Sequence, residues 1–203
     1  MVLLVAMKLV AGLGNPGKEY ERSRHNTGFI MLDFILGKKA DWKEDAKAKA
    51  LYWKEGAGKK EVEYLKPMSF MNNSGSPVSY AREKHKVKLQ DIAVIYDDID
   101  LPLGFMKISF NKSSGGHKGL DSVIKKLKSR EFMRVRIGIS PITPAGKLRK
   151  PKGEGKVLKH LLGSFKESEL EKLKKLSKKV AKTIETFIAE GKDKAMNLHN
   201  QRS

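Results

Sequence analysis

One histidine and one group of aspartates are residue types that could together carry out acid–base chemistry. His25 lies in the polar segment RHN at residues 24–26, and Asp97, Asp98 and Asp100 follow the apolar run IAVIY at residues 92–96. A carboxylate that accepts the imidazole Nδ1–H fixes the tautomer of a histidine and leaves Nε2 free to take a proton from water. These residues therefore predict a hydrolytic centre in which His25 activates water and one of the three carboxylates supports it.

A set of polar and apolar side chains follows two predicted strands and could bind the ligand. Ligands of open α/β sheets bind outside the carboxyl ends of the strands, so we expect these side chains to lie near His25. There the apolar side chains could pack against an acyl chain or a sugar, although apolar residues are usually part of a protein core. Asn72 could hydrogen-bond a carbonyl. The set comprises Asn15, Tyr20, Phe70, Met71 and Asn72.

The segment GLGNPG at residues 12–17 also satisfies the dinucleotide-binding pattern G-x-G-x-x-G. That pattern requires a helix to begin near its second glycine, so that helix amides face the pyrophosphate. Here Pro16 moves the preceding residue out of the helical region, and the next helix is expected only from Asn26. We interpret the match as coincidental and expect no nucleotide cofactor.

Other reaction chemistries find little support. The chain has no cysteine, no G-x-S-x-G segment and no H-E-x-x-H spacing, which excludes thiolate chemistry and disfavours serine hydrolases and zincins. The acidic run at residues 97–100 could hold Mg²⁺, although acidic turns are common without a metal. We expect neither a metal nor another cofactor.

Charge is the strongest feature of the composition. The 203 residues carry a formal net charge of +19, which favours a polyanionic partner such as nucleic acid, although a lysine-rich proteome is an alternative explanation. Residues 147–160 hold six Lys or Arg and one Glu, and are predicted to be a mobile basic loop suited to phosphates. No run is long enough for a signal peptide or a membrane helix, so we expect a cytoplasmic protein. Residues 1–6 are interpreted as an N-terminal extension.

Strand and helix patterns alternate along the chain. This order predicts an α/β fold, a single domain over residues 1–203 with one mixed twisted sheet and helices on both faces. A capping box at Ser168 and a stop at Gly191 are expected to bound the last helix. Strands are expected at residues 8–13, 49–56, 61–67, 92–96, 105–110 and 133–139, and helices at 26–36, 76–86, 115–128 and 168–191.

Over about residues 8–200 the sequence resembles the bacterial-type peptidyl-tRNA hydrolase family, whose members cleave the ester between a peptide and tRNA. The motifs that carry this resemblance are GLGNPGKEYERSRHNTG, KPMSFMNNSG, YDDIDLPLG, GGHKGLDSVI and FMRVRIGI, with weaker echoes in HLLGSF and AMNLHN. It implies a monomeric, metal-free esterase that recycles tRNA from stalled or dropped-off peptidyl-tRNA.

The resemblance also implies roles for individual residues. His25 would be the base and Asp97 its support, and Asn15 would read the peptide carbonyl that free aminoacyl-tRNA lacks. Arg136 would bind the 5′ phosphate of the tRNA. The residues implied to line the crevice for the acyl group and the tRNA 3′ end are Tyr20, Phe70, Met71 and Asn72.

Three features depart from the family pattern. Lys118 stands where the family has an asparagine that helps to bind tRNA, and Ser109 stands where a second phosphate-binding lysine is common. The basic segment around residues 147–156 is also longer than usual. These departures keep one rival open, an RNA-binding relative of the same fold that lacks hydrolytic activity.

Overall fold

The protein is built on one mixed sheet of seven strands, described by a computed structural model over residues 7–200. The expected extension at residues 1–6 lies outside the described residues. The strand order is β2-β3-β4-β1-β5-β7-β6. The strands are β1 (Lys8–Gly12), β2 (Lys43–Asp45), β3 (Ala50–Glu55), β4 (Val62–Pro67), β5 (Ile92–Pro102), β6 (Met106–Phe110) and β7 (Met133–Ser140).

The middle of the sheet is parallel and its two edges are antiparallel. Strand β1 pairs in parallel with β4 and β5, and β5 pairs in parallel with β7. Strands β3 and β2 extend one edge in antiparallel fashion, and β6 runs antiparallel to β7 at the other. The carboxyl ends of four adjacent strands therefore share one edge of the sheet, where ligands of such folds bind.

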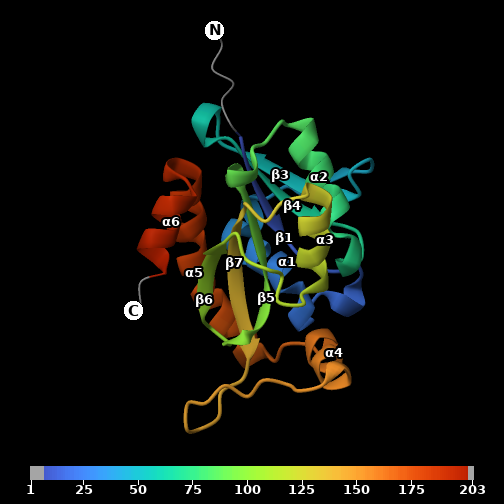
Figure 1. The fold of residues 1–203 in the computed structure, drawn as a ribbon, viewed down its shortest axis with the longest axis vertical. Helices are drawn as coiled ribbons and strands as arrows, with labels where there is room; N and C mark the ends of the chain where they lie inside the picture. The colour runs from blue at the N-terminus through green and yellow to red at the C-terminus, as the bar shows by residue number, and fades with distance from the viewer. Residues whose placement is uncertain (1–6, 201–203) are drawn as a thin grey trace.

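Helices cover both faces of the sheet (Figure 1). The helices α1 and α5 contact each other over one face, and α2 and α3 contact each other over the opposite one. Helix α4 lies beyond the end of the sheet, beside a long loop that follows β7 (Figure 1). The helices are α1 (Thr27–Leu36), α2 (Gly75–Lys84), α3 (Lys118–Leu127), α4 (Glu154–Leu162), α5 (Glu167–Glu190) and α6 (Lys192–His199).

A close approach between β1 and α1 positions the loop that carries His25. A Cβ atom added to Gly28 would lie 2.2 Å from the backbone nitrogen of Leu13 and 2.5 Å from the carbonyl oxygen of Ile95. Only glycine allows the first turn of α1 to pack this tightly on the sheet. The short 3₁₀ turn η2 (Arg24–Asn26), directly before α1, is thereby held over the carboxyl ends of β1 and β5.

The predicted α/β fold is confirmed, and so are its six strands and four helices, with small differences at their ends. Strand β5 continues to Pro102, so Asp97 lies within a paired strand rather than after it. The capping box predicted at Ser168 was wrong, because α5 begins at Glu167 and Glu169 accepts the bond from the Lys166 N–H at 2.8 Å.

Three elements were not predicted, namely β2, α4 and α6. Strand β2 has three residues, too few to show an alternating pattern. Helix α4 begins at Glu154, inside the segment 147–160 that was predicted to be a mobile loop, and continues to Leu162. That prediction was wrong for the second half of the segment, where α4 contacts η2 and its Leu161 packs against the core.

Candidate active site

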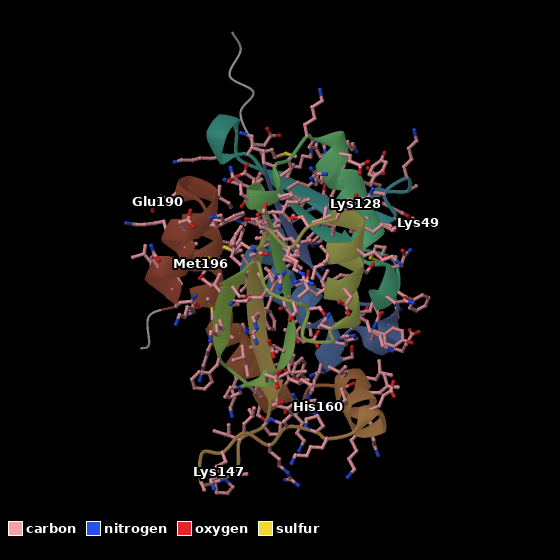
Figure 2. All side chains as sticks on the ribbon, viewed as in Figure 1. Lys49, Lys128, Lys147, His160, Glu190 and Met196 are labelled. Carbon is pink, nitrogen blue, oxygen red and sulfur yellow. The ribbon has the colours of Figure 1, made fainter. Side chains whose placement is uncertain are left out.

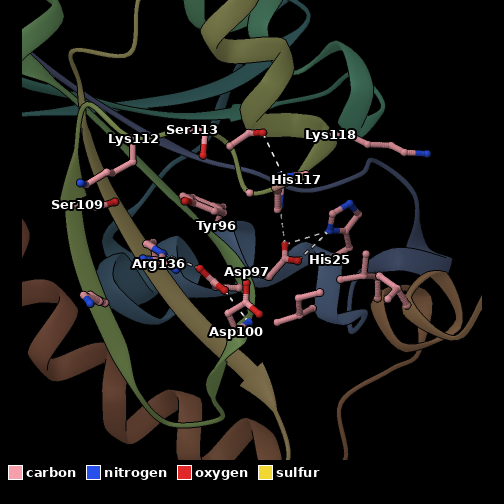
Figure 3. Close-up of a pocket in the computed structure, with 18 of the residues that line it drawn as sticks. His25, Tyr96, Asp97, Asp100, Ser109, Lys112, Ser113, His117, Lys118 and Arg136 are labelled. Atoms are coloured by element: carbon pink, nitrogen blue, oxygen red, sulfur yellow. Dashed lines mark hydrogen bonds and ion pairs between the residues drawn. The ribbon is translucent and has the colours of Figure 1, made fainter. Parts of the chain in front are cut away.

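His25 and Asp97 form a buried pair at the carboxyl edge of the sheet. His25 is 7% exposed and Asp97 is 2% exposed. The His25 Nδ1 lies 3.0 Å from Oδ2 and 3.1 Å from Oδ1 of Asp97 (Figure 3). With Nδ1–H donated to the carboxylate, the imidazole retains Nε2 as its free basic nitrogen.

His117 is a second partner of Asp97, and the sequence interpretation gave it no role. Its Nε2 lies 3.1 Å from Asp97 Oδ1 (Figure 3). Its Nδ1 accepts the backbone N–H of Leu120 at 3.1 Å. Because Nδ1 is an acceptor here, the proton must sit on Nε2 and be donated to Asp97. His117 therefore contacts Asp97 through one ring nitrogen while the other caps α3. The sequence signal that could have pointed to His117 is its position directly after Gly115 and Gly116 and before the first residue of α3.

The electrostatics of the pair favour a protonatable His25 and an ionised Asp97. Burial disfavours the charged imidazole of His25 and so lowers its pKa. The charge and hydrogen bond of Asp97 outweigh burial, and the net effect is a raised pKa of His25. The positive charge of Lys118 acts in the opposite direction and lowers the His25 pKa. Burial alone would raise the pKa of Asp97, yet the two histidines lower it well below its usual range. Asp97 is thus a fixed negative charge against the imidazole.

A pocket of about 610 Å³ opens beside this pair. Its walls include His25 and Asp97, the loop between β6 and α3, and the apolar face of α4. The cationic side chains that line it are Lys107, Lys112, Lys118 and Arg136, and α4 contributes Val157, Leu158 and Leu161. Four carboxylates also line it, namely Asp97, Asp98, Asp100 and Glu154, so the pocket combines charges of both signs with an apolar wall.

Arg136 anchors the cationic side of the pocket. Its Nε donates to Asp98 Oδ2 at 2.6 Å, which fixes the guanidinium and leaves its terminal N–H groups for a ligand (Figure 3). Lys107 is directly opposite Arg136 in the β6–β7 ladder, so both side chains lie on one face of the sheet. Ser109 lies on the same face and is buried in the pocket wall.

Asn15 is held rigidly in the loop after β1. Its Oδ1 accepts the backbone N–H of Met71 at 2.8 Å. Its backbone N–H and C=O pair with the side-chain amide of Asn26 at 2.8 and 2.9 Å. Because the side-chain oxygen is occupied, the group that Asn15 can offer a ligand is its NH₂, a hydrogen-bond donor.

The remaining predicted binding residues lie outside the walls of this pocket. Tyr20 is half-buried in a 3₁₀ turn, Phe70 is 61% exposed, and Asn72 is exposed on the turn before α2. Met71 is buried in the core, with its sulfur against Gly119 of α3. Asn15 lines a second pocket of about 590 Å³ on the α1 side. The structure thus brings His25, Asp97, Lys118 and Arg136 together in one pocket and leaves the other five outside its walls.

The acidic run at residues 97–100 does not converge on one point. Asp97 faces the two histidines, Asp98 pairs with Arg136, and Asp100 pairs with Lys150. Within residues 7–200, the side chains that could together hold a metal ion are instead His25, Asp97 and His117, whose ligand atoms lie within 4.8 Å of one another. Metal binding there would require the imidazoles to give up their hydrogen bonds to Asp97.

Residues 9–203 match the protein-family model described as Peptidyl-tRNA hydrolase. The chain belongs to the peptidyl-tRNA hydrolase family. It is 39% identical to the peptidyl-tRNA hydrolase of Aquifex aeolicus over 199 residues, which cover 97% of each chain. It is 37% identical to that of Desulfitobacterium hafniense, over 96% of this chain and 100% of the relative.

Solved structures of the peptidyl-tRNA hydrolase family share the fold. The crystal structure of the enzyme from Acinetobacter baumannii matches with a TM-score of 0.84 and 26% identity, over 97% of this chain and 96% of that one. The family, the enzyme class and the fold expected from the sequence are thereby confirmed. Between residues 7 and 200, no helix is both long and apolar enough to span a membrane.

Proposed function

We propose that this member of the peptidyl-tRNA hydrolase family releases tRNA from peptidyl-tRNA by means of water activated at His25. It would act as a single-domain monomer and recycle tRNA from stalled or dropped-off peptidyl-tRNA. The observation that carries the proposal is the pairing of His25 Nδ1 with Asp97 at 3.0 Å in the wall of a pocket that Arg136 and three lysines also line. Family membership supplies the substrate class.

The reaction balances with no component beyond water and the two side chains. His25 Nε2 takes a proton from water as the water oxygen forms a bond to the ester carbonyl carbon. The bond between that carbon and the ribose oxygen then breaks, and the imidazolium returns its proton to the leaving ribose oxygen. The products are the peptide acid and a tRNA with a free terminal hydroxyl. Asp97 stabilises the imidazolium that exists between the two proton transfers.

Asn15 is the proposed reader of the acyl group. Its NH₂ would donate to the peptide carbonyl, an acceptor that an unblocked aminoacyl ester lacks. Leaving a buried donor unpaired costs about 1–3 kcal/mol, enough to favour peptidyl over free aminoacyl esters. Met71 would support this contact through its backbone N–H, while Tyr20, Phe70 and Asn72 would contact the acyl group or the tRNA end from outside the pocket.

The cationic wall is the proposed site for the RNA end. Arg136 would bind the 5′ phosphate with its free N–H groups, and Lys118 would contact the RNA as a donor only. Lys107 and Lys112 line the same wall and could supply the contacts that Ser109 cannot. The need for such phosphate contacts would explain part of the excess positive charge of the chain.

The test compares the hydrolysis of N-acetyl-aminoacyl-tRNA with that of free aminoacyl-tRNA. We expect the wild-type protein to cleave only the blocked ester. The variant His25→Asn should lose about 10²–10⁴-fold in rate, the usual contribution of a general base, and keep its affinity for tRNA within about twofold. A control variant, His199→Asn, alters a histidine that contacts Thr186 on the α5–α6 side and should retain the wild-type rate. No turnover by pure wild-type protein would favour the non-hydrolytic RNA-binding relative.

A further inference from the structure

The loop after β7 is a shaped arm rather than an extended linker. Residues 141–153, which we name the basic arm, leave the end of β7 and return to the start of α4 (Figure 1). Ile142 and Leu148 form an antiparallel bridge. The backbone N–H of Thr143 donates to the backbone carbonyl of Lys147 at 2.8 Å, and the N–H of Arg149 donates to the carbonyl of Pro141 at 2.8 Å. The arm is therefore a hairpin that presents its side chains in a defined arrangement.

The basic arm carries only positive charge. Its charged residues are Lys147, Arg149, Lys150 and Lys152, all of them exposed. Within residues 7–200, Lys150 pairs with Asp100, while the side chains of the other three make no hydrogen bond or ion pair with protein groups. Three cations are thus available to an external ligand.

The root of the arm is the rim of the active-site pocket. Asp100, the partner of Lys150, lines that pocket, and so do Glu154 and Leu158 of the helix that follows the arm. Lys147 lies at the far tip of the arm, away from the sheet (Figure 2). The cations of the basic arm therefore begin where the cationic wall with Arg136 ends and extend away from the pocket.

We propose that the basic arm binds the phosphate backbone of the tRNA acceptor stem, beyond the nucleotide whose ester lies at His25. The inference rests on the proposed function, because the substrate itself brings a duplex backbone to this rim. Each phosphate that a cation neutralises releases counterions, which favours binding. A hairpin that is already formed loses little conformational entropy when it binds.

The test neutralises the three free cations of the arm and measures steady-state kinetics on N-acetyl-aminoacyl-tRNA. The arm variant is Lys147→Gln/Arg149→Gln/Lys152→Gln. The matched control, Lys175→Gln/Lys178→Gln/Lys182→Gln, removes three exposed lysines from α5, on the opposite side of the sheet from α3. At about 0.1 M salt the arm variant should raise KM about tenfold or more and keep kcat within about twofold. The control should change KM by less than about twofold.

The salt dependence of kcat/KM and the kinetics on a short substrate test whether the basic arm binds RNA. The slope of log(kcat/KM) against log[salt] should become shallower by about 2 in the arm variant, since each phosphate contact contributes about 0.7–0.9. On an N-acetyl-aminoacyl CCA trinucleotide, which has no stem, the difference between wild type and arm variant should disappear. An equal defect on both substrates, or a loss in kcat alone, would overturn the proposal.

The outcome for the arm is separable from that for the proposed function. If the wild type hydrolyses the blocked ester and the arm variant behaves like the α5 control, the arm proposal fails and the function stands. If the wild type does not hydrolyse it, the affinity of the two proteins for deacylated tRNA, measured by fluorescence anisotropy, still decides. Equal affinities would then overturn RNA binding by the arm.

Discussion

The imidazole of His25 and the carboxylate of Asp97 lie 3.0 Å apart, although the two residues are separated by 72 positions in the chain. His25 follows β1 and Asp97 lies in β5, and these strands are parallel neighbours. Their pairing therefore depends on the strand order of the sheet rather than on any local segment. This dependence gives four predictions for the site and the elements that hold it.

The variant Asp97→Asn should lower kcat about 10²–10⁴-fold. It removes the charge that keeps His25 basic and places an NH₂ group against an imidazole donor in place of one of the two carboxylate oxygens. Burial would then dominate, and the His25 pKa would fall below its ordinary value. The residual activity should thus reach its plateau at a lower pH than wild type, as measured by a pH–rate profile. An acid limb at unchanged pH would show that Asp97 does not control the imidazole.

The wild-type kcat/KM should rise with pH through a pKa above 6.5, because His25 must be neutral to act and Asp97 raises its pKa. Lys118→Gln removes a positive charge that lowers this pKa, so the acid limb should move to higher pH. The control Lys126→Gln, in the last turn of the same helix, should leave the limb in place. A shift to lower pH in Lys118→Gln would contradict the electrostatic assignment.

Gly28→Ala should destabilise the protein by about 3 kcal/mol or more, because the new methyl group would overlap backbone atoms at 2.2 and 2.5 Å. The shift of α1 should also move His25 and reduce activity about 10²-fold. Urea unfolding and kinetics measure the two effects. Gly155→Ala in α4 is the control, because a Cβ there meets nothing within 4 Å, and it should be neutral or stabilising by about 0.5 kcal/mol.

Arg24, which directly precedes His25, should contribute more to the stability of the protein than Arg22, two positions earlier in the chain. Arg24 donates to Glu169 at 2.8 Å and to the carbonyl of Gly163 at 3.1 Å, and its side chain is 12% exposed. Arg22 pairs with Glu167, where the two side chains are 53% and 77% exposed. Arg24→Met should cost about 1–3 kcal/mol, while Arg22→Met should cost about 0–1 kcal/mol. Similar costs by thermal or urea unfolding would refute a special role for Arg24 in holding η2 to the α4–α5 junction.

Local pattern was sufficient to predict most of the fold. The apolar run at residues 92–96 indicated a strand covered on both faces, and the repeat of apolar residues before Gly191 indicated a long helix. Helix α4 was missed because its apolar face is short and its neighbours are lysines and glycines. Its contacts are with the distant turn η2 and, through Leu161, with the core, which no local pattern records.

The candidate residues of the site could be named from the sequence because the proposed chemistry depends on residue types. An imidazole, a carboxylate and an amide at the ends of predicted strands are enough to indicate a hydrolytic centre, and His25, Asp97 and Asn15 carry these groups. Only the tertiary structure decided how they combine. It paired Asp97 with two histidines and tied the Asn15 oxygen to Met71. The reason is physical, because each of these contacts joins segments distant in the chain, and the burial of both sheet faces brings such segments together.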